Sequence, residues 1–206
     1  MRILATLALW FAGCAYAALT APASELIGKS VIDPARADLG RVHDLILDLR
    51  EARVEYAVLG FGGWAGIFDK QFAIPIEKFT PAPYSDKLVL ERAKDILLLE
   101  PGIDSTGLPD GEAEYWRGID RWYERYDGRA PALRQYARAS MLIGREVVDR
   151  TGEPIGELAD FQIDLASGEV LDALLALEGD MRRVPLALLR VPSGREAIVY
   201  HTGDKP

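Results

Sequence analysis

Short runs of apolar and polar residues fill most of the chain, and they predict β-strands. The runs cover 26–33, 39–49, 54–61, 72–76 and 87–90 in the first half, and 141–149, 155–165, 169–177, 182–188 and 197–201 in the second. Within 39–49, side chains that alternate with a period of two place Val42 and Asp44 on the same face of the strand. Within 54–61, the same period places Val54 and Tyr56 on one face. Several short strands joined by turns predict antiparallel sheets or small barrels.

The stretch 112–126, between the two sets of strands, has helical periodicity instead. Its large apolar side chains recur every three or four residues, at Trp116, Ile119, Trp122, Tyr123 and Tyr126. This face either packs on a barrel as the buried side of a satellite helix or contacts a partner. The second alternative makes Trp116 and Trp122 candidate partner contacts. The flanking stretches 93–99 and 130–139 predict a helical turn and a linker.

The two sets of strands are copies of one another. The motif Leu-Ile-Gly at 26–28 recurs at 142–144, and at the same offset of 116 residues twelve of the 34 positions from Ser24 to Ala57 are identical. Such self-similarity at a fixed period is the signature of an internal repeat. The motif at 74–76 matches 184–186 at an offset of 110 instead, so the second copy has a shorter loop before this point.

The longer loop of the first copy, 60–70, contains four glycines together with Trp64, Ile67 and Phe68. Either these apolar side chains fold back on the barrel from a glycine-bulged hairpin, or they form a partner-binding loop. An apolar loop tip is costly unless something covers it, so the second alternative makes Trp64 and Phe68 candidate partner contacts. The stretch is no phosphate loop, because it lacks the required glycine–lysine spacing.

The order of these motifs resembles the PRC-barrel domain family. The motifs are Leu-Ile-Gly, then Gly40 followed by Asp44 and Asp48, then Gly-Gly-Trp-Ala-Gly at 62–66 closing on Ala-Ile-Pro at 73–75. That family is the small β-barrel shared by the photosynthetic reaction centre H subunit and the ribosomal RNA maturation factor. The resemblance covers 25–91 well and 140–202 more loosely. It implies a six-stranded barrel used for assembly and protein contacts, without catalytic residues to carry over.

We therefore expect a mainly β protein with a helical insert, made of two small antiparallel PRC-like β-barrels in tandem. The expected boundaries are a leader over 1–23, a first barrel over 24–91, a helical linker over 92–139, a second barrel over 140–202 and a tail over 203–206.

The leader has the pattern of an export signal. Arg2 precedes an apolar run, and Ala15-Tyr16-Ala17 matches the small-residue pattern before a cleavage site. Cleavage after Ala17 gives a soluble form, whereas 11–14 resembles a bacterial lipobox and makes Cys14 a candidate for lipidation. An uncleaved leader would be an anchor, since its apolar run is at the lower limit for spanning a bilayer. All three outcomes place the folded part in the periplasm or cell envelope.

Charge and composition argue against several kinds of binding and catalytic site. The formal net charge of −8 argues against nucleic acid, whose binding depends on Lys and Arg neutralising phosphates. Cys14 is the only cysteine, which excludes a cysteine nucleophile or a cysteine metal site in the folded part. The two histidines, His43 and His201, have no further metal ligands at a suitable spacing. We expect neither a metal nor a cofactor.

Paired aspartates recur in both copies, as Asp44 with Asp48 and as Asp160 with Asp164. Residues four apart on one strand lie about 13 Å apart, which is too far for acid–base work within one pair. We attribute these residues to strand-end turns and edge protection.

The expected function is that of an exported, non-catalytic binding or assembly protein of the bacterial cell envelope. It would act on a protein partner or by self-association, and it would touch the membrane only through an N-terminal lipid or anchor. One alternative is an enzyme with an unrecognised site between the barrels, which a pocket of convergent groups with perturbed pKa values would favour. The other is ribosomal RNA binding, which the export signal and the negative charge disfavour.

Overall fold

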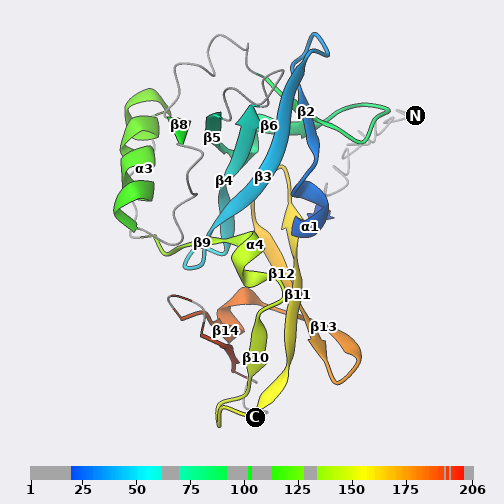
Figure 1. Ribbon diagram of the computed structural model, residues 1–206, viewed down its shortest axis with the longest axis vertical. Helices are drawn as coiled ribbons and strands as arrows, with labels where there is room; N and C mark the ends of the chain where they lie inside the picture. Colours follow the sequence, from blue (N-terminus) through cyan, green and yellow to red (C-terminus); the bar gives the residue numbers. More distant parts are fainter. Residues whose placement is uncertain are drawn as a thin grey trace, which may run out of the picture.

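The protein forms two lobes, each built on one curled β-sheet (Figure 1). The computed structural model describes residues 20–61, 70–91, 102–103, 113–127, 134–192, 194 and 196–201. One sheet has eight strands and the other has seven. The expected mainly β fold with a helical insert and two tandem barrels is therefore confirmed.

The first lobe, barrel 1, contains the strands of the first repeat and one short strand from the middle of the chain. They are β2 (Ser30–Ile32), β3 (Asp38–Asp48), β4 (Arg53–Phe61), β5 (Lys70–Pro75), β6 (Phe79–Pro81), β7 (Leu88–Leu90) and β8 (Gly102–Ile103). The second lobe, barrel 2, contains β10 (Glu146–Val148), β11 (Pro154–Asp164), β12 (Val170–Leu177), β13 (Asp180–Val184), β14 (Leu189–Arg190) and β15 (Ile198–Tyr200).

Among the described residues, two strands and three helices lie outside these sets. The strands are β1 (Thr20–Pro22) and β9 (Tyr136–Arg138), and the helices are α1 (Ala23–Leu26), α3 (Ala113–Asp127) and α4 (Ala139–Leu142). Each barrel also has one 3-10 turn, η1 (Ile76–Lys78) or η2 (Leu186–Leu188). The predicted helix over 112–126 is confirmed as α3.

The sheets are mainly antiparallel, as expected, but each described sheet also contains one parallel pair. Strand β2 pairs with β7 in parallel, and β10 pairs with β15 in parallel, while the other named pairs are antiparallel. The cause is the β6–β7 hairpin and its repeat, β14–β15. Each hairpin returns its second strand to the first strand of the barrel in the same direction.

The Leu-Ile-Gly motif ends a helical turn, so the strands predicted at 26–33 and 141–149 begin too early. In the first copy the amide of Ile27 donates to the carbonyl of Ala23, and Gly28 then turns the chain with φ 88. The second copy does the same in α4. Two adjacent apolar residues fit one buried helical turn as well as they fit a strand, so periodicity could not separate the two.

Two β-bulges in barrel 1 overturn the predicted faces of its long strands. One extra residue in β3, His43, and one in β4, Glu55, shift the pairing register. As a result Val42 and Val54 belong to the interior core, on the face opposite to the one predicted. Barrel 2 has the same two register shifts in β11 and β12.

The backbone repeat extends to turns whose residues differ. Three residues of barrel 1 adopt a left-handed conformation where barrel 2 has glycine. They are Arg36 (φ 67), Ala52 (φ 50) and Tyr84 (φ 61), which match Gly152 (φ 89), Gly168 (φ 76) and Gly194 (φ 83). Left-handed backbone is unfavourable for a side-chain-bearing residue, so the fold imposes these turns on both copies.

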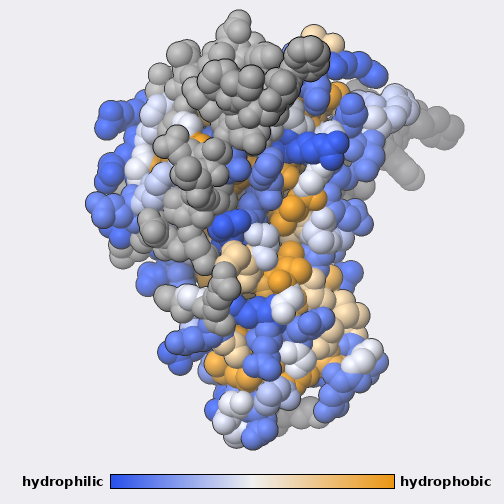
Figure 2. Space-filling model, viewed as in Figure 1, coloured by the Kyte–Doolittle hydropathy of each residue, from blue (hydrophilic) through white to orange (hydrophobic). Residues whose placement is uncertain are grey.

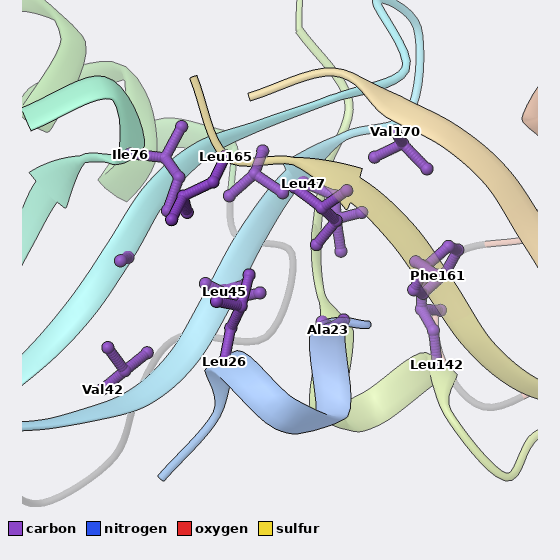
Figure 3. Close-up of a cluster of buried hydrophobic side chains, with 14 of the residues drawn as sticks. Ala23, Leu26, Val42, Leu45, Leu47, Ile76, Leu142, Phe161, Leu165 and Val170 are labelled. Atoms are coloured by element: carbon purple, nitrogen blue, oxygen red, sulfur yellow. The ribbon is translucent and has the colours of Figure 1, made fainter. Parts of the chain in front are cut away.

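The hydrophobic core is continuous across the two barrels. Buried side chains from both repeats form one cluster, which includes Leu45 and Leu47 of barrel 1 together with Phe161 and Val170 of barrel 2. In Figure 3, α1 and α4 lie next to each other in this cluster, between the long strands of the two barrels. The two lobes are therefore joined by apolar packing as well as by the chain.

Candidate functional site

The two barrels exchange short arms. Strand β1 precedes barrel 1 in the sequence but pairs with β11 of barrel 2. Strand β9 precedes barrel 2 but pairs with β3 of barrel 1. The two registers are equivalent, because Thr20 pairs with Asp164 as Tyr136 pairs with Asp48, at the repeat offset of 116. Each barrel thus completes the sheet of the other in a pseudo-two-fold arrangement.

The arms start earlier in the sequence than the expected boundaries of the two barrels. Thr20–Ala23, which we had assigned to the leader, form β1 and the start of α1. Tyr136–Ala139, which we had assigned to the linker, form β9 and the start of α4. Both arms therefore belong to the described sheets, β1 to that of barrel 2 and β9 to that of barrel 1.

A serine on each arm donates to an aspartate of the opposite barrel. The amide and hydroxyl of Ser24 donate to Asp160 at 3.1 and 2.5 Å. The amide and hydroxyl of Ser140 donate to Asp44 at the same two distances. Asp44 also accepts a hydrogen bond from the guanidinium Nε of Arg138 at 2.8 Å. Each carboxylate is buried, with Asp44 only 1 % exposed, whereas both serines are exposed, so each contact runs from an exposed serine to a buried carboxylate.

A second reciprocal contact lies beside the first. The amide of Val54 donates to the carbonyl of Gly168, and the amide of Val170 donates to the carbonyl of Ala52, both at 2.7 Å. Between them, Arg53 forms an antiparallel bridge with Glu169. These backbone bonds join the β3–β4 turn of barrel 1 to the β11–β12 turn of barrel 2.

The repeated aspartates therefore have two different roles. Asp48 and Asp164 accept from turn amides, those of Arg50 at 2.9 Å and Ala166 at 2.8 Å, as predicted for strand-end turns. Asp44 and Asp160 join the barrels, and our assignment of them to turns or edge protection was wrong. One signal pointed to this role, since Ser24 and Ser140 recur together with these aspartates at one offset.

Helix α3 packs on the outer face of barrel 1. Trp116 and Tyr123 are fully buried there, and their rings stack on Tyr56 with centroids 6.2 and 5.7 Å apart. The hydroxyl of Tyr123 donates to the carbonyl of Ala73 in β5 at 2.8 Å. The expectation of a satellite helix is confirmed, while the nomination of Trp116 as a contact residue is corrected, since Trp116 has no exposed surface.

Barrel 2 has no matching apolar face, which explains why α3 packs on barrel 1. At the repeat positions of Ile46, Tyr56, Val58 and Ala73, barrel 2 has Gln162, Asp172, Leu174 and Arg183. The first set is buried beneath the helix, whereas three members of the second are polar. Trp122 is only partly buried and lies edge-on to Tyr123 at 4.8 Å, so it stays a candidate contact.

A buried polar cluster fixes α3 to the barrel. The carboxylate of Asp120 accepts from the hydroxyl of Tyr56 at 2.5 Å and, through its other oxygen, from the hydroxyl of Tyr136. Arg134 donates to Asp120 at 3.1 Å and to Glu55 at 2.7 Å. The sequence-based reasoning missed this cluster, although an acidic residue on the apolar face of a predicted helix was a visible signal.

Burial sets the protonation states in this cluster. Burial raises the pKa of Tyr56 and of Tyr136, and the hydrogen bond and negative charge of Asp120 raise both further. Burial lowers the pKa of Arg134, but the carboxylates of Glu55 and Asp120 outweigh it and leave that pKa above its ordinary value. The tyrosines are therefore neutral donors and the arginine is a cation.

The raised tyrosine pKa values predict a loss of stability in alkali. Tyrosine in the unfolded chain ionises near pH 10, and Tyr56 and Tyr136 ionise higher in the folded protein. Their contribution to stability is complete below about pH 10 and is lost above it, because the unfolded chain then releases protons that the folded protein retains. A tyrosinate absorbance titration should show a fraction of the tyrosines, including Tyr56 and Tyr136, ionising only as the protein unfolds. Smooth ionisation of every tyrosine without unfolding would contradict the cluster.

Several predicted features lie outside the described residues. They are the leader with Cys14, the loop tip with Trp64 and Phe68, the helical turn at 93–99 and the tail at 203–206. Within the described ranges, no helix has the length and apolar character needed to cross a membrane. The same ranges contain no group of three or more His, Cys, Asp or Glu placed to hold a metal ion.

Comparison with known proteins agrees with the repeated fold. The family model for the PRC-barrel domain matches residues 20–101 and 135–203, and no curated protein matches the chain. The matched segments begin at 20 and 135, so each includes the arm that its barrel gives to the other. They confirm the resemblance that the motifs indicated, and together they cover most of the sequence. The chain belongs to the PRC-barrel family, with two tandem copies of the domain.

Proposed function

We propose that this protein is an exported, non-catalytic binding or assembly protein of the bacterial cell envelope. Membership of the PRC-barrel family supports a binding or assembly role. The arm exchange carries the proposal further, because it holds two barrels with unequal surfaces in one unit. Barrel 1 carries α3 and a longer loop, whereas barrel 2 leaves the matching sheet face polar. Such a unit can present two different surfaces to its partners.

The described acidic groups at the junction and under α3 serve structural contacts. Asp44 and Asp160 join the barrels, and Asp120 and Glu55 hold α3 through Arg134. The junction itself is filled by the shared apolar core. These contacts support a role in binding rather than catalysis.

The start of the fold supports the export part of the proposal. Strand β1 begins at Thr20, and the predicted cleavage position follows Ala17. Cleavage there would remove the apolar leader and leave the whole arm that pairs with barrel 2. Lipidation at Cys14 would leave a five-residue spacer before β1.

Replacing Cys14 separates the two processing routes. If 11–14 is a lipobox, Cys14→Ser should move the mature protein from the membrane fraction to the soluble periplasmic fraction, because the lipid anchor is lost. The measurement is cell fractionation with mass spectrometry of the mature N-terminus. A wild-type protein that is soluble and begins at Ala18 contradicts lipidation and retains export. A full-length protein in the cytoplasm contradicts export itself.

The loop 60–70 is the proposed partner contact. If Trp64 and Phe68 contact a partner, Trp64→Ala and Phe68→Ala should change the free energy of unfolding by less than about 0.5 kcal/mol. They should also weaken capture of the partner from envelope extract, since aromatic residues dominate binding hot spots. Tyr84→Ala, which removes a fully exposed aromatic of barrel 1, is the matched control and should leave capture unchanged. A loss of about 3–5 kcal/mol with unchanged capture would place both residues in the core.

A further inference from the structure

The outer end of barrel 2 carries an open pocket of about 560 Å³. Val148 and Val199 line it together with three cationic or potentially cationic side chains, Arg150, Arg190 and His201. The β10–β11 turn, which bears Arg150, lies at the end of this lobe away from barrel 1 (Figure 1). The chain as a whole is acidic, with a net charge of −8, so this group of basic side chains differs from the rest of the chain.

Strand pairing places these side chains on one face. Val148 pairs with Val199 across β10 and β15, and Val199 pairs with Arg190 across β15 and β14. Residues paired in this way point to the same side of a sheet. His201 follows Val199 by two positions, and its amide donates to the carbonyl of Leu188 at 2.8 Å. Val148 and Val199 therefore form the apolar part of the pocket lining, and Arg150, Arg190 and His201 form its basic part.

The turn that carries Arg150 is held by its own hydrogen bonds. One carboxylate oxygen of Asp149 accepts from the amide and hydroxyl of Thr151 at 2.7 and 2.6 Å and from the amide of Glu153 at 3.0 Å. The hydrogen bond from the Thr151 side chain, together with the backbone bonds, holds the pKa of Asp149 below its usual range. This carboxylate is the only acidic group that lines the described pocket, so the lining holds one negative charge together with the two guanidinium groups of Arg150 and Arg190.

Barrel 1 has the same backbone arrangement but other residues at these three positions, and Arg36 is the only cationic residue that lines the described pocket there. Ile32 pairs with Val89, and Val89 pairs with Thr80, so the three strands repeat the arrangement of barrel 2. Thr80 stands in the place of Arg190, Glu91 in the place of His201, and Pro34 in the place of Arg150. The pocket at this end is smaller, about 220 Å³. Because barrel 1 folds without the cationic residues, the fold alone does not require them.

We propose that the outer end of barrel 2 is a binding site for an anionic ligand, whose carboxylate or phosphate group lies between Arg150, Arg190 and His201. Guanidinium groups bind both anions through paired, charge-assisted hydrogen bonds. Val148 and Val199 contact the apolar part of the ligand. The site goes beyond the proposed envelope function and is independent of export, since it is tested on the purified protein.

The test is a titration of the isotope-labelled protein followed by amide chemical shifts. Inorganic phosphate and succinate are the two probes, added at constant ionic strength. We expect at least one probe to shift the amides of 148–152 and 199–201 in a saturable manner, and the comparison distinguishes a phosphate ligand from a carboxylate ligand. The double variant Arg190→Thr with His201→Glu installs the residues of barrel 1, and it should weaken binding roughly tenfold or more.

A matched pair of substitutions controls for overall charge. Arg117→Thr with His43→Glu makes the same two changes at exposed positions on α3 and β3. This control should bind the probes as the unchanged protein does. The proposal is overturned if neither probe shifts the pocket amides, or if the control loses as much affinity as the pocket variant.

Discussion

Asp44→Ala is expected to lower the free energy of unfolding by about 3 kcal/mol, one of the two largest effects in this chain. The substitution removes the buried carboxylate that accepts from Arg138 and from the amide and hydroxyl of Ser140 at the junction between the barrels. Removing one partner of a buried ion pair costs about 3–5 kcal/mol. The lower end of that range applies because the Arg138 side chain is 24 % exposed and so keeps part of its hydration.

The equivalent aspartate of the second repeat, Asp160, allows a comparison with Asp44. Asp160→Ala removes the acceptor of the Ser24 amide and hydroxyl and of the Phe161 amide, but of no arginine, because Pro22 stands where the other arm has Arg138. It should cost about 0.5–1.5 kcal/mol, the net contribution of a hydrogen bond, because Ser24 is exposed and its donors can bind water after the change. Asp180→Ala, on an exposed hairpin, should stay within about 0.5 kcal/mol. Chemical denaturation measures all three, and equal losses at Asp44 and Asp160 would contradict the role of Arg138.

The internal repeat made the strands and the two-barrel fold predictable from the sequence. Long alternating runs such as 39–49 and 155–165 became β3 and β11 with ends displaced by only one residue. The face assignments failed at His43 and Glu55, because a bulge adds one residue and inverts every side chain beyond it. A period of two cannot show where such a residue is inserted.

The arm exchange could not be predicted from local pattern. Thr20–Pro22 is too short for alternation to be recognised, and it pairs with residues about 140 positions later in the chain. The export pattern also extends up to this strand, so composition alone assigned Ala21 and Pro22 to the leader. Only the joint recurrence of serine and aspartate carried information about the partner, and it did not say which copy each serine contacts.

Helix α3, unlike the arm exchange, could be predicted from its local sequence, but the surface on which it packs could not. Periodicity predicted both α3 and its apolar face, while the choice between a barrel and a partner needed the other side of the contact. That choice is decided by Tyr56 and Val58, which give barrel 1 an apolar outer face. The solvent-facing edge of α3 is hydrophilic (Figure 2), as expected for a helix that buries one side only.

Asp120→Ala should release α3 from barrel 1, with a cost to docking of about 3–5 kcal/mol. The change removes the acceptor of Tyr56 and Tyr136 and one of the two acceptors of Arg134, in a cluster that is buried apart from the partly exposed Arg134. The apolar contacts of α3 form a cluster separate from the core that joins the barrels. The loss should therefore be local, with the barrels still folded.

Hydrogen exchange separates local release from global unfolding. In Asp120→Ala, amides of 113–127 should exchange faster, while those of β3 and β11 keep their protection, since local opening need not involve the main core. Glu114→Ala, at an exposed position on the same helix, is the control and should leave every segment unchanged. If β11 loses protection together with α3, then the helix is part of the cooperative unit that holds the two barrels together. If α3 keeps its protection, the carboxylate of Asp120 does not fix the helix and the apolar stacking on Tyr56 is sufficient.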